Sequence, residues 1–198
     1  MIRRPLPALD PASTALVLID LQRGIVSRPT EPRSGADVVH NAARLAEAAR
    51  TCGVLVVLVH VSFPPDFANA VNTDVDEKPP TVASPGWDEL MDELRPDKAD
   101  VLIVKRQWGA FYGTNLDLEL RRRHRRSIVL GGISTNFGVE STARDAWELN
   151  YQLVLVEDAM AGFRAEDHEF AVTKIFPRLG RVCLTEDVLG VWTAAGAG

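Results

Sequence analysis

The sequence has few cysteines and no excess of positive charge. Only two of its 198 residues are cysteines, Cys52 and Cys183, which fits a reducing compartment better than a disulfide-stabilised secreted domain. The net charge is -5 at pH 7, and this argues against nucleic-acid binding, which needs a basic face. We therefore expect a cytoplasmic protein without a nucleic-acid partner.

The sequence also lacks a long apolar run. Its apolar stretches, such as Val54 to Val59, are far shorter than the roughly 20 residues that cross a bilayer. Arg3 and Arg4 are not followed by the apolar segment of a signal peptide. The length and the hydrophobic content of 46% suit one globular domain with a real core. With no repeat or linker to divide the chain, we predict a single domain over residues 1–198 and no membrane partner.

What the sequence does contain is an alternation of short β-branched runs with longer amphipathic ones. The runs are apolar almost throughout, which is typical of parallel strands buried on both faces. Repeated strand–helix units predict an α/β fold: a three-layer, doubly wound, Rossmann-like, mostly parallel six-stranded sheet with helices on both faces. The predicted strands are Ala15 to Ile19, Val54 to Val61, Val101 to Val104, Ser127 to Leu130, Leu153 to Val156 and Arg181 to Leu184.

The helices are predicted between these strands, and one long proline-rich loop interrupts the pattern. The loop covers residues 63–86, with prolines at 64, 65, 79, 80 and 85, and a loop of that length is typical of a lid or a binding loop. Thr114 and Asp117 form a capping-box-like pair at the start of one helix. The predicted helices are Ala36 to Thr51, a short one near Trp87 to Glu93, Leu116 to His124, Val139 to Leu149 and Glu166 to Phe176.

Polar residues follow several strands at their carboxyl ends, where open α/β sheets bind ligands. Asp20 follows the first strand and Lys105 the third. The fourth strand runs into a Gly-Gly-Ile-Ser-Thr-Asn-Phe-Gly turn (131–138) and then a helix, which brings backbone N–H groups to the same edge, suited to an anion or an oxyanion. An acid, an ammonium and an amide-rich turn on one edge indicate a hydrolytic site. His60 and Ser62 end strand two, and Glu157 and Asp158 end strand five.

Each of these features also has an ordinary structural interpretation. An aspartate after an apolar strand is a common turn residue, a lysine at a strand end is commonly solvated, and the glycine-rich turn lacks the spacing of a phosphate loop. His60 fits a hydrogen-bonded core or rim histidine better than a catalyst. The basic block from Arg121 to Arg126 lies at a helix C-terminus, where cations interact well with the helix dipole.

Taken together and in order, these motifs resemble the isochorismatase-like superfamily of hydrolases. The resemblance rests on Leu-Ile-Asp-Leu-Gln (18–22), Lys-Arg-Gln-Trp-Gly-Ala-Phe-Tyr-Gly-Thr-Asn-Leu (105–116), Gly-Gly-Ile-Ser-Thr-Asn-Phe-Gly-Val-Glu-Ser-Thr-Ala-Arg-Asp-Ala (131–146) and Val-Glu-Asp-Ala (156–159). It covers nearly the whole chain, from Thr14 to about Val188. It implies a catalytic Asp20, with Lys105 as its electrostatic partner, and a cis peptide between Ile133 and Ser134. The oxyanion and substrate residues that it implies are Ile133, Ser134, Thr135, Phe137, Gln22 and Phe111.

The chain departs from this family at one position. The cysteine nucleophile of most members corresponds to Gly138 here, and neither native cysteine fits the motif. Without a thiol there is no thioester, whereas isochorismatases, which also have glycine there, cleave a vinyl ether with the aspartate as general acid and water as nucleophile. The Asp-x-His arrangement that binds metal in nicotinamidases is also missing. We therefore expect Asp-based hydrolysis of a small molecule, with no metal or cofactor. The resemblance also implies a homo-oligomer, a dimer or higher.

Two questions stay open at this point. One is the activity, because the alternatives to vinyl-ether hydrolysis are a binding protein that keeps the family pocket and an amidase that uses water instead of a cysteine. The other is the protonation of Asp20, since Lys105 nearby lowers the pKa of its carboxyl and burial raises it.

Overall fold

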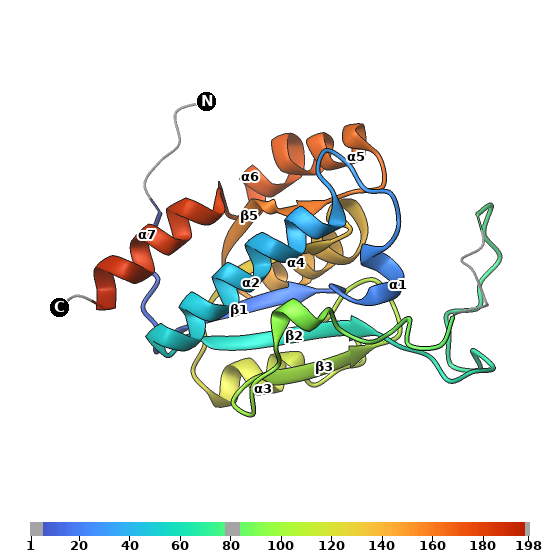
Figure 1. Cartoon of the computed structure of the whole chain (residues 1–198), viewed down its shortest axis with the longest axis horizontal. Coiled ribbons are helices and arrows are strands. Elements are labelled where there is room, and N and C mark those ends of the chain that lie inside the picture. The colour runs from blue at the N-terminus through green and yellow to red at the C-terminus, as the bar shows by residue number, and fades with distance from the viewer. Residues whose placement is uncertain (1–5, 78–83, 197–198) are drawn as a thin grey trace.

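The computed structural model describes residues 6–77 and 84–196, which form a parallel sheet between two layers of helices (Figure 1). The sheet has six strands in the order β3-β2-β1-β4-β5-β6. All its pairings are parallel, which confirms the predicted architecture. The strands are β1 (Thr14–Ile19), β2 (Leu55–Val61), β3 (Val101–Lys105), β4 (Ser127–Ile133), β5 (Gln152–Ala161) and β6 (Arg181–Cys183).

The strands lie where the apolar runs predict them, with one difference of consequence. Strand β5 does not end at Glu157 and Asp158 but continues to Ala161, and its pairing with β4 shifts register between Leu130 and Gly132. Both acidic residues therefore lie inside an irregular strand. Asp158 Oδ1 accepts hydrogen bonds from the N–H (2.7 Å) and hydroxyl (2.8 Å) of Thr185, and so fixes the start of the last helix.

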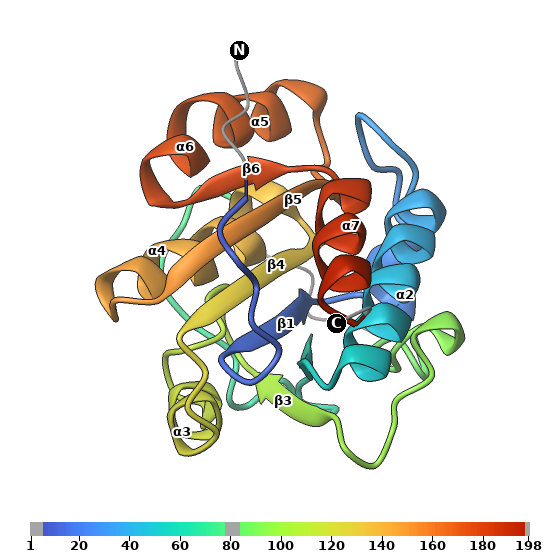
Figure 2. The ribbon, with the colours of Figure 1, turned by 90° about the vertical axis from the view of Figure 1, so that its left-hand side faces the viewer.

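Helices cover both faces of the sheet. Helix α2 (Gly35–Cys52) starts at a capping box made by Ser34 and Asp37 and packs with α7 (Thr185–Gly196) on one side. Figure 2 shows α2 and α7 on that side and α3 (Leu116–Arg122) and α4 (Glu140–Glu148) on the other. The remaining helical elements are α1 (Arg23–Val26), the 3-10 turn η1 (Asp92–Leu94), the π-helical turns η2 (Thr135–Val139) and η3 (Ala171–Ile175), α5 (Ala165–Phe170) and α6 (Phe176–Leu179).

Three of the predicted helical features differ from the structure. The short helix expected near residues 87–93 is reduced to η1, because the carbonyls of Trp87 and Glu89 accept hydrogen bonds from residues 24 and 23 instead. The helix expected over residues 166–176 is divided by η3. Asp117 does not complete a capping box with Thr114, since its carboxylate binds Arg121 and Tyr151.

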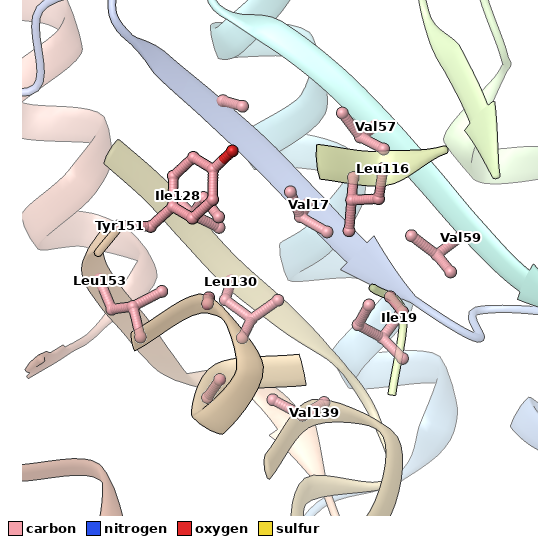
Figure 3. Packing of buried hydrophobic residues seen from close by; sticks show 14 of the residues in the cluster. Val17, Ile19, Val57, Val59, Leu116, Ile128, Leu130, Val139, Tyr151 and Leu153 are labelled. Atoms are coloured by element: carbon pink, nitrogen blue, oxygen red, sulfur yellow. The ribbon is translucent and has the colours of Figure 1, made fainter. Parts of the chain in front are cut away.

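Two apolar cores fill the space between the sheet and its helices. Figure 3 shows the one under α3 and α4, where alternate residues of β1 and β2 such as Val17 and Val57 meet Leu116 and Tyr151. Leu16 and Leu58 point the opposite way, into the core under α2 and α7. The strands are therefore packed on both faces.

Residues 63–77 of the long loop after β2 extend away from the body of the molecule beyond the carboxyl edge of the sheet (Figure 1). At its base the rings of Phe63, Phe67 and Trp87 stack with centroids 5.2–6.5 Å apart. Pro79 and Pro80 lie outside the described residues. A role as a lid or a binding loop stays a prediction.

Candidate functional site

Asp20 is the first residue beyond β1 and is almost completely buried, with 5% of its surface exposed. Its backbone has φ 53°, in the left-handed region that residues other than glycine seldom adopt, and its N–H donates to the carbonyl of Val59 at 2.8 Å. Unusual backbone conformations of this kind cluster at functional sites. The chain therefore turns sharply at the strand end and holds this carboxylate inside the protein.

Lys105 reaches the same carboxylate from β3, two strands away in the sheet. Its Nζ lies 2.7 Å from Asp20 Oδ2, and the two side chains are 2% and 6% exposed. The ammonium also donates to the carbonyl of Gln107 at 2.9 Å. Asp20 Oδ1, in contrast, is buried and has no hydrogen-bond partner among the described residues. The nearby N–H of Val61 donates to Gln22 Oε1 instead, at 2.9 Å.

The pKa of the Asp20 carboxyl is raised above its ordinary value. Burial is the largest influence, because it penalises the ionised form. It outweighs the charge and hydrogen bond of Lys105, the charge of His60 and the nearby N–H of Val61, all of which lower the pKa. Of the two opposing effects expected from the sequence, desolvation is therefore the stronger. A carboxyl with a raised pKa is suited to donating a proton.

The turn after β4 lies beside this ion pair. At Gly132 the backbone has φ 133°, and a Cβ would meet the carbonyl oxygen of Ile19 at 2.2 Å, so that only glycine allows β4 to lie this close to β1. The Ile133–Ser134 peptide is cis. The carbonyl of Ser134 accepts hydrogen bonds from the N–H groups of residues 137 and 139, which closes the π-helical turn η2.

Gly138 is the residue of this turn that faces Asp20. A Cβ built on Gly138 would lie 3.1 Å from Asp20 Oδ2 and 3.0 Å from Cγ2 of Ile19, with the carbonyl of Trp108 at 3.6 Å. The Gly138 carbonyl accepts a hydrogen bond from Thr142 at 2.7 Å, which fixes this end of the turn to α4. Asp20, Lys105 and Gly138 therefore lie together at the carboxyl edge of the sheet.

The residues that were expected to bind the oxyanion or the substrate lie at several places around Asp20 and Lys105. The amide of Gln22 is occupied by backbone groups, since its Nε2 donates to the Val61 carbonyl at 2.9 Å, and it therefore ties the ends of β1 and β2 together. Phe111 packs against Tyr151 in the core, with ring centroids 5.8 Å apart. Neither side chain is free to bind a substrate. Ile133 is fully buried in the core on the opposite face of the sheet.

Ser134, Thr135 and Phe137 remain at the turn itself. The hydroxyl of Ser134 lies 3.3 Å from Asn136 Oδ1. Phe137 is 36% exposed and packs against the exposed Trp108, which the sequence analysis did not select, at a centroid distance of 4.8 Å. The two rings form an apolar surface over the outer side of the turn.

His60 and Ser62, at the end of β2, both bind Asp88. His60 Nδ1 lies 2.8 Å from the Asp88 carbonyl, and the Ser62 hydroxyl donates to Asp88 Oδ2 at 2.5 Å. This contact agrees with the interpretation of His60 as a hydrogen-bonded core or rim histidine. These residues hold the segment after the long loop against the sheet.

His168 is a site residue that the sequence analysis missed. It lies on α5, is 3% exposed and has its Nδ1 2.8 Å from the hydroxyl of Thr135. Burial, and to a smaller extent the charge of Arg33, lower the pKa of His168 to about 4. Its position in Ala-Glu-Asp-His-Glu-Phe gives no pattern that would distinguish it from a surface residue.

In the described part of the chain, no three histidine, cysteine or acidic side chains gather as a metal site would require. Over the same residues, none of the helices is both long and apolar enough to span a membrane.

The sequence profile of the isochorismatase domain matches residues 14–187. A relative in Escherichia coli O157:H7, the uncharacterised isochorismatase family protein YecD, is 46% identical over 182 residues, which cover 91% of this chain and 97% of the relative. YwoC of Bacillus subtilis, an uncharacterised protein of the same family, is 45% identical over 186 residues, covering 91% and 95%.

Relatives at lower identity include the ureidoacrylate amidohydrolase RutB of Variovorax paradoxus, 35% identical over 182 residues that cover 79% of this chain and 72% of that protein. Among solved structures, an isochorismatase family protein of Burkholderia thailandensis superimposes with a TM-score of 0.90 at 45% identity, covering 96% of this chain and 98% of the other. The sequence match and the shared fold agree: the chain belongs to the isochorismatase family of hydrolases.

Proposed function

We propose that this hydrolase cleaves a small-molecule vinyl ether, with Asp20 as general acid and water as the nucleophile. The observation that carries the proposal is the asymmetry of the Asp20 carboxyl. Oδ2 is held by Lys105 at 2.7 Å, whereas Oδ1 is buried without a partner among the described residues. A buried polar atom is seldom left unpaired, and Oδ1 is therefore the atom that we assign to the substrate.

The proposed reaction needs no acid other than Asp20. The carboxyl protonates the terminal carbon of the C=C bond, and water adds to the resulting oxocarbenium ion while Asp20 takes back a proton. The hemiketal then collapses to a carbonyl compound and an alcohol. The raised pKa of Asp20 supports the first step, since a larger fraction of the carboxyl carries a proton at a given pH.

Lys105 and the turn have supporting roles in this proposal. The Lys105 ammonium fixes the orientation of the carboxyl and stabilises its ionised form after proton transfer. The turn from Ile133 to Gly138 binds the negative charge that develops on the leaving oxygen as the hemiketal collapses. No metal or cofactor is required. We further expect a cytoplasmic homo-oligomer, as inferred from the sequence.

The proposal also assigns Gly138 to the position that a nucleophilic cysteine occupies in most of the family. The direction of a Cβ at this position, 3.1 Å from Asp20 Oδ2, supports the assignment. A thiol introduced by Gly138→Cys would lie beside a carboxylate that could act as its base and a cation that stabilises the thiolate. The matched control is Ser141→Cys, because this half-buried residue lies only three positions further along, on α4.

Iodoacetamide labelling followed by mass spectrometry tests this assignment. We expect the thiol of Gly138→Cys to react faster than that of Ser141→Cys and faster than Cys52 or Cys183, of which the latter is buried. If the Gly138→Cys thiol labels no faster than these three, the alignment of the turn is wrong. The contacts at 3.0–3.1 Å require small shifts of Ile19 and Asp20, so circular dichroism must first show that the variant folds.

A second candidate activity is amide hydrolysis without a cysteine. It is favoured by one specific finding, the similarity to the ureidoacrylate amidohydrolases, which are named for cleavage of an amide-type substrate. The identity to these proteins is 35% or lower, against 45–46% for the uncharacterised relatives.

Parallel assays with vinyl ethers, amides and esters separate the candidates. For the native chain we expect turnover of vinyl ethers, its loss in Asp20→Asn, and its retention in the double variant Cys52→Ser/Cys183→Ser. Turnover of amides alone would favour the second candidate. No turnover of any class, together with unchanged ligand binding in Asp20→Asn, would indicate a binding protein that keeps the family pocket. Inactivation by thiol alkylation without unfolding would mean that a cysteine is the nucleophile.

A further inference from the structure

His168 is a buried titratable group that the proposed reaction does not use. Its ring lies on α5 behind the Ile133–Gly138 turn, and Nδ1 is 2.8 Å from Oγ1 of Thr135, a residue with no exposed surface. Nε2 of the same ring has no hydrogen-bond partner among the described residues. Within that part of the chain, the contact with Thr135 is therefore the ring's only hydrogen bond.

Helix α5, which carries His168, is held at its start by hydrogen bonds to the loop before α2. The carboxylate of Glu31 accepts a hydrogen bond from the N–H of Ala165, the first residue of α5, at 2.9 Å. Glu31 and Gly162 also exchange two backbone hydrogen bonds, at 2.9 and 2.8 Å, just before the helix begins. Arg33 adds hydrogen bonds to two carbonyls of β5. These contacts connect the loop before α2 to the start of α5 and to β5, and they give the helix that carries His168 a support outside the turn.

The contact between His168 and Thr135 fixes one end of the turn, and a second threonine fixes the other. The hydroxyl of Thr142 donates to the Gly138 carbonyl at 2.7 Å and accepts from the N–H of Ala110 at 3.1 Å. The backbone between these two anchors carries residues 136–138. Any displacement of Thr135 therefore changes the path of the chain at Gly138, next to Asp20.

The imidazole is neutral at physiological pH, because burial and Arg33 keep its pKa near 4. It consequently adds no positive charge to the site, and its contribution is directional: it orients a hydroxyl. A neutral ring nitrogen and a hydroxyl form one well-defined hydrogen bond.

We propose that His168 is a positioning residue for the reaction, acting through the hydroxyl of Thr135 to hold the Ile133–Gly138 turn against Asp20. The inference rests on the proposed function, which assigns that turn to the reacting site. His168 does not touch the substrate in this account. Its loss displaces the turn while Asp20 and Lys105 stay in place.

The test uses the Gly138→Cys protein as its background, because the reactivity of the introduced thiol reports on the turn without any knowledge of the substrate. The variants His168→Leu and Thr135→Val remove the hydrogen bond. The conservative variants His168→Asn and Thr135→Ser keep it, since the asparagine amide occupies the place of Nδ1. His40→Leu, at an exposed histidine of α2, is the control for a histidine change elsewhere.

We expect His168→Leu and Thr135→Val to slow iodoacetamide alkylation of the introduced thiol by about tenfold, the effect of one buried hydrogen bond. The pH dependence of alkylation should show a raised pKa of that thiol. The variants His168→Asn, Thr135→Ser and His40→Leu should stay within about threefold of the background rate, and the combined His168→Leu/Thr135→Val change should equal the single ones, because the two residues act as a unit.

Two results would overturn the inference. One is an unchanged alkylation rate in a folded His168→Leu variant. The other is an equal slowing by His168→Asn and His168→Leu, which would mean that the ring only fills space.

A second measurement applies if the introduced thiol is no more reactive than that of Ser141→Cys, a result that refutes the proposed site. Amide hydrogen exchange of residues 134–139 is then measured without the Gly138→Cys change. We expect faster exchange there in His168→Leu and Thr135→Val, and native protection in His168→Asn, Thr135→Ser and His40→Leu. Native protection in His168→Leu would overturn the positioning role of His168 independently of the reaction.

Discussion

At each end of strand β3 a buried carboxylate pairs with a cation, and the two pairs have the same length. At the amino end, Asp100 Oδ2 lies 2.7 Å from Arg50 Nη2, and at the carboxyl end Asp20 Oδ2 lies 2.7 Å from Lys105 Nζ. Both oxygens of Asp100 have partners: Oδ1 accepts from Arg50 Nε, and Oδ2 accepts also from the N–H of Asp97. Asp20 has Oδ1 left without a partner among the described residues.

We interpret this difference as the one between a structural ion pair and the proposed catalytic pair. The pair of Arg50 and Asp100 joins α2 to the start of β3, and Arg50 also donates to the Leu94 carbonyl. Its hydrogen bonds are complete, which offsets the desolvation of the charges. The pair of Asp20 and Lys105 is more deeply buried and less complete. An incomplete buried pair is destabilising unless a ligand uses the free atom, and we therefore assign chemistry to the carboxyl end alone.

The largest expected effect compares Asp20→Asn with Asp100→Asn. Loss of the proposed general acid should lower kcat by about 10²–10⁴-fold, whereas Asp100→Asn should leave kcat within about twofold, because the change lies at the far end of β3. Asp100→Asn should instead lower the free energy of unfolding. For both variants, steady-state kinetics give kcat and urea unfolding gives the free energy of unfolding. Equal losses of kcat in the two folded variants would remove the distinction between the pairs.

The next largest effect is a loss in the free energy of unfolding when the cation of either pair is removed. Lys105→Met should lower the free energy of unfolding by about 3 kcal/mol or more, because it leaves a buried carboxylate without its cation. The double variant Asp20→Asn/Lys105→Met should recover most of this loss, since neither charge is then buried. Arg50→Met should lose less, because Arg50 is a quarter exposed. Urea unfolding at pH 7 gives the values. A double variant as unstable as Lys105→Met would show that the buried charge is not the cause.

His168 differs from the two buried ion pairs, because this buried titratable side chain is neutral at pH 7. Its pKa is about 4 in the folded protein and about 6.5 when exposed. The unfolded chain therefore takes up a proton first as the pH falls, and stability is retained above pH 6.5 and lost between about pH 6.5 and 4. At about 1.4 kcal/mol per pKa unit, the loss is about 3 kcal/mol.

The reference for this measurement is His168→Asn, which does not titrate at this position. The difference in unfolding free energy between the native chain and His168→Asn should change by that amount between pH 7 and pH 4. Because Asp20 titrates in both proteins, its contribution cancels. A difference that is the same at the two pH values would mean that the folded and unfolded pKa values of His168 coincide.

Much of the fold could be predicted from the sequence because of two-sided burial. Strands such as β1 are apolar at every position, and this pattern depends little on the rest of the chain. Helix α7 was not predicted, since Gly190 and the small residues that follow weaken its helical pattern. Residues 87–91 were predicted as helical from local composition, but their backbone groups bind residues 21–24, and these tertiary contacts determine the conformation.

The central pair of the site could also be predicted, because the carboxyl ends of neighbouring parallel strands meet at one edge. That position alone selects Asp20 and Lys105. It does not show which motif residues face the edge, and Phe111 lies in the core although its motif suggests the site. The contact between Thr135 and His168 joins residues 33 positions apart, and a lone histidine on a helix has no periodicity that would reveal it.

The most direct test of the account is the titration of the Asp20 carboxyl, followed by carbon NMR of the protein labelled at aspartate Cγ and assigned with Asp20→Asn. The account requires a midpoint above the ordinary aspartate value of about 3.9, because burial outweighs the Lys105 charge, and a further rise in Lys105→Met. A midpoint below that value would mean that Lys105 dominates, and Asp20 would then be a carboxylate base and not the proton donor of the proposed reaction.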